Sequence, residues 1–169
     1  MTVSGDVKQV FSAFIGIGSN LDVPKGQIFQ AITEIAQLDD TTLLQQSSLY
    51  RSTALGADKQ PDYLNAVVEI ATALSPQALL EELQAIEHHH GRVRKQRWEP
   101  RPLDLDILLY GNQLISTDTL TVPHPEMLKR HFVLYPMAEI APVLNIPGAA
   151  DIKVLLQQCP MAELQKIID

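Results

Sequence analysis

Two aspartates spaced two residues apart follow directly after a strongly cationic stretch of the chain. Asp104 and Asp106 alternate with large aliphatic residues from Leu103 to Leu109, a pattern typical of a strand with one face in the core. Residues i and i+2 of a strand share a face, so we expect both carboxylates to project together, roughly 6.5 to 7 Å apart along the chain. The cationic residues before them are Arg92, Arg94, Lys95, Arg97 and Arg101. Carboxylates bind hard cations such as Mg²⁺ and guanidinium groups bind phosphates, so this segment is suited to a polyphosphate site.

Simpler interpretations exist for both features, because a charged loop is usually just solvated and an acidic pair on a strand can face water. The charge of the loop favours a function. Residues 92–101 hold five cations and one carboxylate, Glu99, and so carry a net charge of +4 in a chain whose net charge is −7. Such a local reversal of sign predicts an anionic ligand or partner. For the aspartates alone, a metal site and a solvated pair both stay open.

The composition limits the class of protein. A length of 169 residues fits one domain with a real core, and we expect residues 1–169 to form it, with residues 1–10 as a short N-terminal extension. The isoelectric point near 5.1 argues against a general nucleic-acid binder. Cys159 is the single cysteine, which rules out an internal disulfide and suits a reducing cytoplasm. We find neither an apolar run of about 20 residues nor a signal-peptide core.

Hydrophobic periodicity predicts four strands and two helices. The strands are expected at residues 11–18, 41–52, 63–74 and 103–110. One helix begins at Pro24, and the other begins at Ser75-Pro76, where serine suits the cap and proline the first helical position. Gly91 is placed to end this second helix. The C-terminal third is expected to be irregular and helical.

The predicted order β-α-β-β-α-β is that of a ferredoxin-like α+β sandwich, an antiparallel sheet with both helices on one face and additional C-terminal helical elements. In the third strand the even positions, such as Ala66 and Val68, face the helices. Its odd positions begin with Tyr63 and Asn65. We therefore expect the odd face of this strand and the aspartate face of the fourth strand to be free to build a site.

Other motifs are weaker. The Gly16-Ile17-Gly18 segment lacks the third glycine and the βαβ unit of a dinucleotide-binding fingerprint, and the chain has no P-loop sequence. His88-His89-His90 resembles a metal tract, but adjacent helical residues diverge, so a solvated helix end is the favoured interpretation. Glu87 could brace Arg92. His124 lies between Pro123 and Pro125, which suits a positioned side chain, although by itself a rigid loop with a surface histidine is the favoured interpretation.

Together these segments resemble one family. In order along the chain they are GSNL at 18–21, YRS at 50–52, PDYLNA at 61–66, GR at 91–92, Trp98, RPLDLD at 101–106 and VPHP at 122–125. They resemble the 6-hydroxymethyl-7,8-dihydropterin pyrophosphokinases over roughly residues 11–145. The resemblance implies a ferredoxin-like monomer that uses two Mg²⁺ ions and transfers the β,γ-pyrophosphoryl group of ATP to the pterin hydroxymethyl oxygen, releasing AMP in folate biosynthesis.

The resemblance also implies residue roles. Asp104 and Asp106 would hold both metal ions, and the catalytic set would be Arg92, Arg101, Asp104 and Asp106. The pterin would contact Ser52, Thr53, Leu55, Tyr63, Asn65, Trp98 and Phe132. The nucleotide would contact Gln84, Glu87, Arg92, Arg94, Trp98, Arg101, Ile107, Thr121, His124 and Arg130. The chemistry agrees, since an asparagine amide matches the donor and acceptor edge of a pterin and an aromatic ring such as Phe132 can stack on its face.

Two other classes of function are weighed against this one. A metal-dependent phosphohydrolase could use the same aspartates with water as the nucleophile. A nucleic-acid-binding module could use the loop around Trp98, since aromatic and cationic residues grip single strands. The acidic chain disfavours the module. Tyr63 and Asn65 favour an organic acceptor over water.

Overall fold

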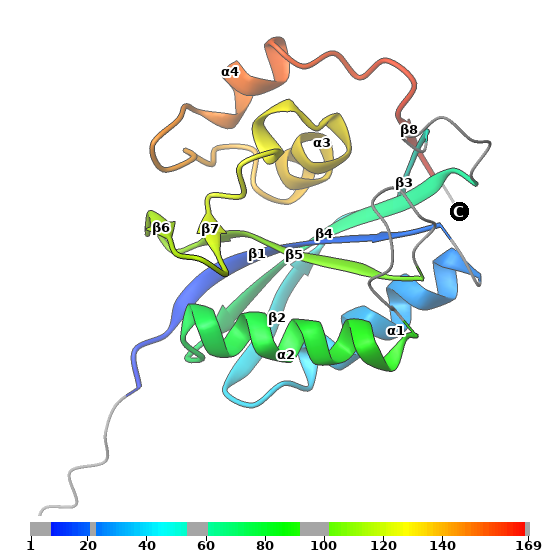
Figure 1. Ribbon diagram of the computed structural model, residues 1–169. Helices are drawn as coiled ribbons and strands as arrows, with labels where there is room; N and C mark the ends of the chain where they lie inside the picture. Colours follow the sequence, from blue (N-terminus) through cyan, green and yellow to red (C-terminus); the bar gives the residue numbers. More distant parts are fainter. Residues whose placement is uncertain (1–7, 21–22, 54–60, 92–101, 168–169) are drawn as a thin grey trace, which may run out of the picture.

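The computed structural model describes residues 8–20, 23–53, 61–91 and 102–167 (Figure 1). The strands are β1 (Phe11–Ser19), β2 (Thr41–Gln46), β3 (Tyr50–Ser52), β4 (Tyr63–Thr72), β5 (Asp104–Tyr110), β6 (Ile115–Ser116), β7 (Thr121–Val122) and β8 (Gln165–Lys166). The helices are α1 (Pro24–Ala36), α2 (Pro76–His89), α3 (His131–Ile140) and α4 (Ile152–Gln157), with a 3₁₀ turn η1 at Met127–Lys129. None of the helices in these ranges is long and apolar enough to cross a membrane.

The main sheet has the order β5-β1-β4-β3-β8, and β2 pairs with β4 alongside β3. All of these pairings are antiparallel. The two longest strands, β1 and β4, lie side by side at the centre, and α1 and α2 lie on one face (Figure 1). This arrangement confirms the predicted ferredoxin-like sandwich.

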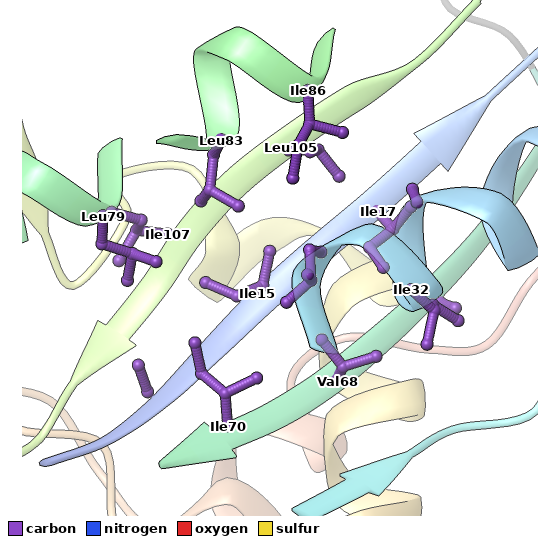
Figure 2. Close-up of a cluster of buried hydrophobic side chains, with 14 of the residues drawn as sticks. Ile15, Ile17, Ile32, Val68, Ile70, Leu79, Leu83, Ile86, Leu105 and Ile107 are labelled. Carbon is purple, nitrogen blue, oxygen red and sulfur yellow. The ribbon is translucent and has the colours of Figure 1, made fainter. Parts of the chain in front are cut away.

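The core between the helices and the sheet follows the predicted periodicity. Ile15 and Ile17 of β1 alternate with glycines and point toward the helices, as do Val68 and Ile70 of β4. Figure 2 shows these side chains meeting Ile32 of α1 and the aliphatic stripe of α2. Because β-strand side chains alternate between faces, burying this set fixes the opposite set on the other face of the sheet.

The start and end of α2 are as predicted. The side-chain oxygen of Ser75 accepts a hydrogen bond from the backbone N–H of Ala78 at 3.1 Å, and Pro76 occupies the first turn. Gly91 follows the helix with φ of +84°, a conformation that glycine adopts without strain. This boundary places the end of α2 beside the start of β5.

The strand predicted over residues 41–52 is instead two strands, β2 and β3. The break lies at Ser47, whose backbone N–H donates to the Val67 carbonyl at 2.9 Å. Its side-chain oxygen accepts from the Val67 N–H at 2.9 Å, so a hydroxyl replaces a backbone partner in the ladder. This side-chain bond interrupts the regular pairing, which the alternating sequence did not reveal.

The prediction that side chains alternate strictly between the two faces along β5 is also wrong, at the C-terminal end of this strand. Ile15 pairs with Ile107, but Phe14 pairs with Leu109, so β5 contains an extra residue at this point. This bulge turns Leu109 to the face opposite Ile107 and places Tyr110 in the helix-side core instead. The aspartate half of the strand keeps its predicted orientation because it precedes the bulge.

The second face of the sheet is not free along its whole length. Helices α3 and α4 lie over it (Figure 1), and their apolar residues pack on Phe14, Val67 and Leu108. The predicted helical C-terminal third is thus a second layer, and it also contributes β8, a strand that the sequence analysis missed. Asp104, Asp106 and Asn65 lie on the part of this face toward the other end of these strands.

Core packing yields a first prediction. Leu83 is fully buried between α2 and the sheet, so Leu83→Ala should lower the free energy of unfolding by about 2–5 kcal/mol. Leu44→Ala is the matched control, because that side chain is 49% exposed and should cost less than about 0.5 kcal/mol. Urea denaturation measures both changes. Equal losses in the two variants would contradict the packing described here.

Candidate active site

The candidate site is a row of residues that crosses the centre of the sheet. Asp104 of β5 pairs with Gly18 of β1, and Gly18 pairs on its other side with Asn65 of β4. The next row joins Asp106, Gly16 and Val67 in the same way. With strands spaced 4.7–4.9 Å apart, the backbones of Asp104 and Asn65 lie about 9–10 Å apart. Gly16 and Gly18 lie between these residues and carry no side chains, so they form an open surface that we call the glycine floor.

A side chain at either glycine would contact its neighbours across the floor. A Cβ atom on Gly18 would lie 3.4 Å from the side-chain oxygen of Asn65 and 3.8 Å from Tyr63. A Cβ atom on Gly16 would lie 3.3 Å from Leu108. Side chains here would therefore fill the space between the carboxylates and the amide, so the alternation of glycine with isoleucine in β1 builds core on one face and open floor on the other.

The two aspartates share a face, as the sequence predicted, and each is half-buried. The Asp106 side chain is 47% exposed. Within the described ranges no cluster of three or more histidine, cysteine or acidic residues could hold a metal ion. Two carboxylates nevertheless fit Mg²⁺, because this ion keeps several waters and is commonly bound by one or two carboxylates together with substrate phosphates.

Glu87 supports the aspartate strand from the helix side. Its side chain is buried, and one carboxylate oxygen accepts a hydrogen bond from the backbone N–H of Leu105 at 3.1 Å. Leu105 lies between the two aspartates, so this bond fixes the backbone from which both project. Arg92, the partner that the sequence suggested for Glu87, lies outside the described residues.

Asn65 offers only its hydrogen-bond acceptor to the site. Its side-chain nitrogen donates to the Ser52 hydroxyl at 2.8 Å and to the Tyr50 carbonyl at 3.2 Å. Both amide hydrogens are therefore used within the protein, and the amide oxygen remains on the Gly18 side as an acceptor. The sequence analysis gave Asn65 both hydrogen-bonding functions, whereas this arrangement leaves the accepting one for a ligand.

His124 lies on the aspartate side of the row, after the cis peptide bond between Val122 and Pro123. Its Nε2 atom is 3.9 Å from a carboxylate oxygen of Asp106, and its Nδ1 atom accepts from the Glu126 N–H at 3.2 Å. Burial lowers the pKa of His124, although the Asp106 charge opposes this shift. A neutral ring whose Nδ1 accepts must carry its proton on Nε2, which faces Asp106.

The remaining predicted residues are spread around this row. Tyr63 and Ser52 form a cross-strand pair beside Asn65, and the exposed Thr53 hydroxyl donates to Glu163 at 2.9 Å. At the start of α3, the Arg130 guanidinium lies 5.5 Å from the ring centre of Phe132. Leu55, Arg92, Arg94, Trp98 and Arg101 lie outside the described residues.

Three further nucleotide-side predictions lie on α2, β7 and β5. Gln84 is exposed on α2, and Thr121 is exposed on β7. The Ile107 side chain is buried in the helix-side core, on the face opposite Asp106. Only the backbone of Ile107 is placed to face a ligand.

Ser19 and Asn20 are site-supporting residues to which the sequence analysis gave no role. Both are fully buried at the end of β1. The Ser19 hydroxyl donates to the Pro102 carbonyl, and the Asn20 amide donates to the Pro61 carbonyl at 3.3 Å. They fix the chain just before β5 and just before β4. A Ser-Asn pair after a buried strand was the available signal, but the sequence analysis used it only as part of the GSNL segment at 18–21.

The prediction of a solvated histidine tract is wrong for His90. His88 and His89 are exposed, but only 3% of the His90 side chain is exposed, and its Nε2 atom lies 2.9 Å from a Glu34 carboxylate oxygen. Its Nδ1 atom contacts the Gln27 side chain. Because the last turn of α2 packs against α1, His90 joins the two helices.

The fold is that of the ferredoxin-like α+β proteins, and paired carboxylates on an open sheet face are a site type that metal-dependent phosphoryl-transfer enzymes use. Comparison with known families is more specific. The family model described as 7,8-dihydro-6-hydroxymethylpterin-pyrophosphokinase matches residues 14–142. The chain belongs to this family and is a diphosphotransferase. Family membership supports neither the hydrolase nor the nucleic-acid-binding alternative.

Similar proteins agree. A Haemophilus influenzae protein named 2-amino-4-hydroxy-6-hydroxymethyldihydropteridine pyrophosphokinase is 50% identical over 149 residues, covering 88% of this chain and 93% of its own. A Pseudomonas aeruginosa protein of the same name is 45% identical over 154 residues, covering 91% and 95%. The crystal structure of wild-type Plasmodium falciparum HPPK-DHPS with pterin and p-hydroxybenzoate has a TM-score of 0.71 at 12% identity. That match covers 91% of this chain but 44% of the Plasmodium chain, and it supports the fold alone.

The glycine floor yields a second prediction. Gly18→Ala should fold normally, because the added methyl group makes ordinary contacts with Asn65, but it should lower kcat/KM of the pyrophosphokinase reaction about tenfold or more by filling the floor. Gly26→Ala in α1 is the matched control and should stabilise the helix by up to about 1 kcal/mol with full activity. Wild-type kcat/KM in Gly18→Ala would show that the floor is not used.

Proposed function

We propose that this protein transfers the β,γ-pyrophosphoryl group of ATP to the hydroxymethyl oxygen of 6-hydroxymethyl-7,8-dihydropterin in folate biosynthesis. The family match is the observation that carries the proposal. In this reaction the hydroxymethyl oxygen attacks the β-phosphorus. The bond from that phosphorus to the α-phosphate oxygen breaks, giving the pterin diphosphate and AMP.

We assign the ATP side of the reaction to the Asp104 end of the row. Asp104 and Asp106 would hold two Mg²⁺ ions, which when bound neutralise phosphate charge and stabilise the attacking and leaving oxygens. Glu87 keeps the strand between the two carboxylates in place. The neutral His124 offers an Nε2–H donor to a phosphate oxygen without adding a charge that would compete for the carboxylates.

We assign the pterin to the Asn65 end. A pterin is flat and edged with N–H donors and with acceptors, and the free oxygen of Asn65 would accept from one such N–H. The glycine floor at Gly16 and Gly18 admits a flat ring because it carries no side chains. Tyr63, across from Ser52, and Phe132 would supply aromatic surface for the faces of the ring. Holding two substrates at opposite ends of one rigid row supplies proximity and orientation, which account for much of the acceleration in phosphoryl transfer.

We also infer a cytoplasmic monomer. Asp104, Asp106, Asn65 and His124 all come from one chain, so the proposed site needs no second copy. The single Cys159 suits a reducing compartment in which ATP is available.

The deciding experiment measures AMP formation from ATP and Mg²⁺ with and without 6-hydroxymethyl-7,8-dihydropterin. AMP that forms only with the pterin, without release of inorganic phosphate, would establish the transfer. Phosphate release without the pterin would favour hydrolysis instead. Absence of AMP from a folded protein that binds ATP would overturn the proposal.

The metal assignment makes a third prediction. Asp104→Asn and Asp106→Asn keep the size of each side chain but remove its charge, so kcat should fall on the order of 100-fold or more. Asp118→Asn, on the turn between β6 and β7, is the control and should retain wild-type kcat. Turnover and Mg²⁺ titrations measure the effect. A wild-type kcat in either site variant would refute its role as a metal ligand.

A further inference from the structure

The strand β3 is short, so few backbone hydrogen bonds fix its position in the sheet. It contains three residues, Tyr50 to Ser52, and pairs with β4 on one side and the two-residue strand β8 on the other. Strands in globular proteins usually have about five or six residues, so a strand of three residues makes fewer backbone hydrogen bonds to its neighbours than most strands do. Contacts from other elements must therefore fix where β3 lies.

Glu139 of α3 supplies such contacts. One of its carboxylate oxygens accepts from the Tyr50 hydroxyl at 2.8 Å, and the other accepts from the backbone N–H of Ser48 at 2.6 Å. The Lys166 ammonium of β8 lies 3.3 Å from the same carboxylate. A single side chain thus joins α3, the segment leading into β3, and β8.

The protonation states of this cluster support fixed hydrogen bonds. Burial would raise the pKa of Glu139, but the hydrogen bonds from Ser48, Tyr50 and Lys166 outweigh it and lower that pKa. Burial, followed by the hydrogen bond to Glu139 and its negative charge, raises the pKa of Tyr50. Tyr50 therefore stays a neutral donor and Glu139 an ionised acceptor at neutral pH, a charge-assisted pair.

The position of β3 in turn sets the orientation of Asn65. The Asn65 side-chain nitrogen donates to the Tyr50 carbonyl and to the Ser52 hydroxyl, which are both on β3. A shift of β3 would lengthen these bonds and release the amide to rotate. The amide oxygen would then no longer be fixed above the Gly18 floor.

Glu139 lies away from the proposed substrates. It lines a surface cavity of about 300 Å³ together with Phe29, Gln46, Ser47, Ser48, Leu49 and Ile167. Among the residues that the structure describes, none of those proposed to bind pterin, nucleotide or metal lines this cavity. The hydrogen bonds of Glu139 connect it to Asn65 through Tyr50 and β3.

We propose that Glu139 and Tyr50 are positioning residues for the acceptor half of the reaction, and that they fix Asn65 in its accepting orientation through β3. This inference rests on the proposed pterin site. It makes a selective prediction, because the aspartates lie on β5, on the other side of β1, and share none of these hydrogen bonds.

The test compares the pterin and ATP parameters of Tyr50→Phe and Glu139→Ala. Each change removes one or two of the hydrogen bonds that hold β3 in place, so KM for the pterin should rise about 3- to 10-fold. KM for ATP and kcat should stay within about twofold. Glu139→Gln should restore part of the loss, because its amide can donate to the Tyr50 oxygen and still accept from Ser48. Tyr135→Phe on the same helix is the matched control, since its hydroxyl binds the Cys159 carbonyl instead.

Asn65→Ala separates this inference from the proposed site. If Asn65→Ala leaves pterin binding unchanged, the pterin site is misplaced and the positioning role falls with it. If Asn65→Ala weakens pterin binding but Tyr50→Phe and Glu139→Ala do not, the positioning role alone is overturned. Equal losses in the ATP and pterin parameters with a lower Tm would indicate a general structural role and also overturn it. In the Asn65→Ala background, Tyr50→Phe should add no further loss.

Discussion

The pairing of β1 with β4 on one side and β5 on the other is the constraint on which the candidate site depends. It places the Asp104 strand and the Asn65 strand on either side of Gly18. A shift of one residue in either register would turn the carboxylates or the amide into the helix-side core. Burial of Ile15 and Ile17 beneath the helices resists that shift. The hydrophobic core therefore fixes the site geometry.

The second layer of helices divides the open face of the sheet. Helices α3 and α4 bury Phe14, Val67 and Leu108, so that half of the face acts as a second core. The polar half then lies on a sheet packed from both sides, which limits how far its strands can bend. Rigid support of this kind is what phosphoryl transfer requires, because the protein accelerates that reaction chiefly by positioning groups and stabilising charge.

The sequence predicted the parts of this structure that depend on local pattern. The alternation around Asp104 and Asp106, the cap at Ser75 and the order of strands and helices along the chain all follow from periodicity and turn residues. The bulge in β5 could not be predicted, because Leu108 and Leu109 are both apolar and suit either face. The burial of His90 depends on Glu34 and Gln27, which are more than fifty residues away. The role of the Ser47 hydroxyl depends in the same way on Val67.

The sequence alone could not show which hydrogen-bonding function Asn65 and His124 offer to a ligand. That function depends on the partners that each side chain contacts within the protein. The amide nitrogen of Asn65 donates to two oxygens of β3, so the amide oxygen is the group that faces a ligand. The Nδ1 atom of His124 accepts from the Glu126 N–H, so the N–H group at Nε2 is the one that faces a ligand. An asparagine amide and a histidine ring can each both donate and accept hydrogen bonds. In this fold each of the two side chains has only one of these functions left for a ligand. A ligand then meets an acceptor at the Asn65 end and a neutral donor beside the carboxylates. Because the protein fixes these polarities before binding, the two ends of the proposed site would distinguish an N–H edge from a phosphate oxygen without rearrangement.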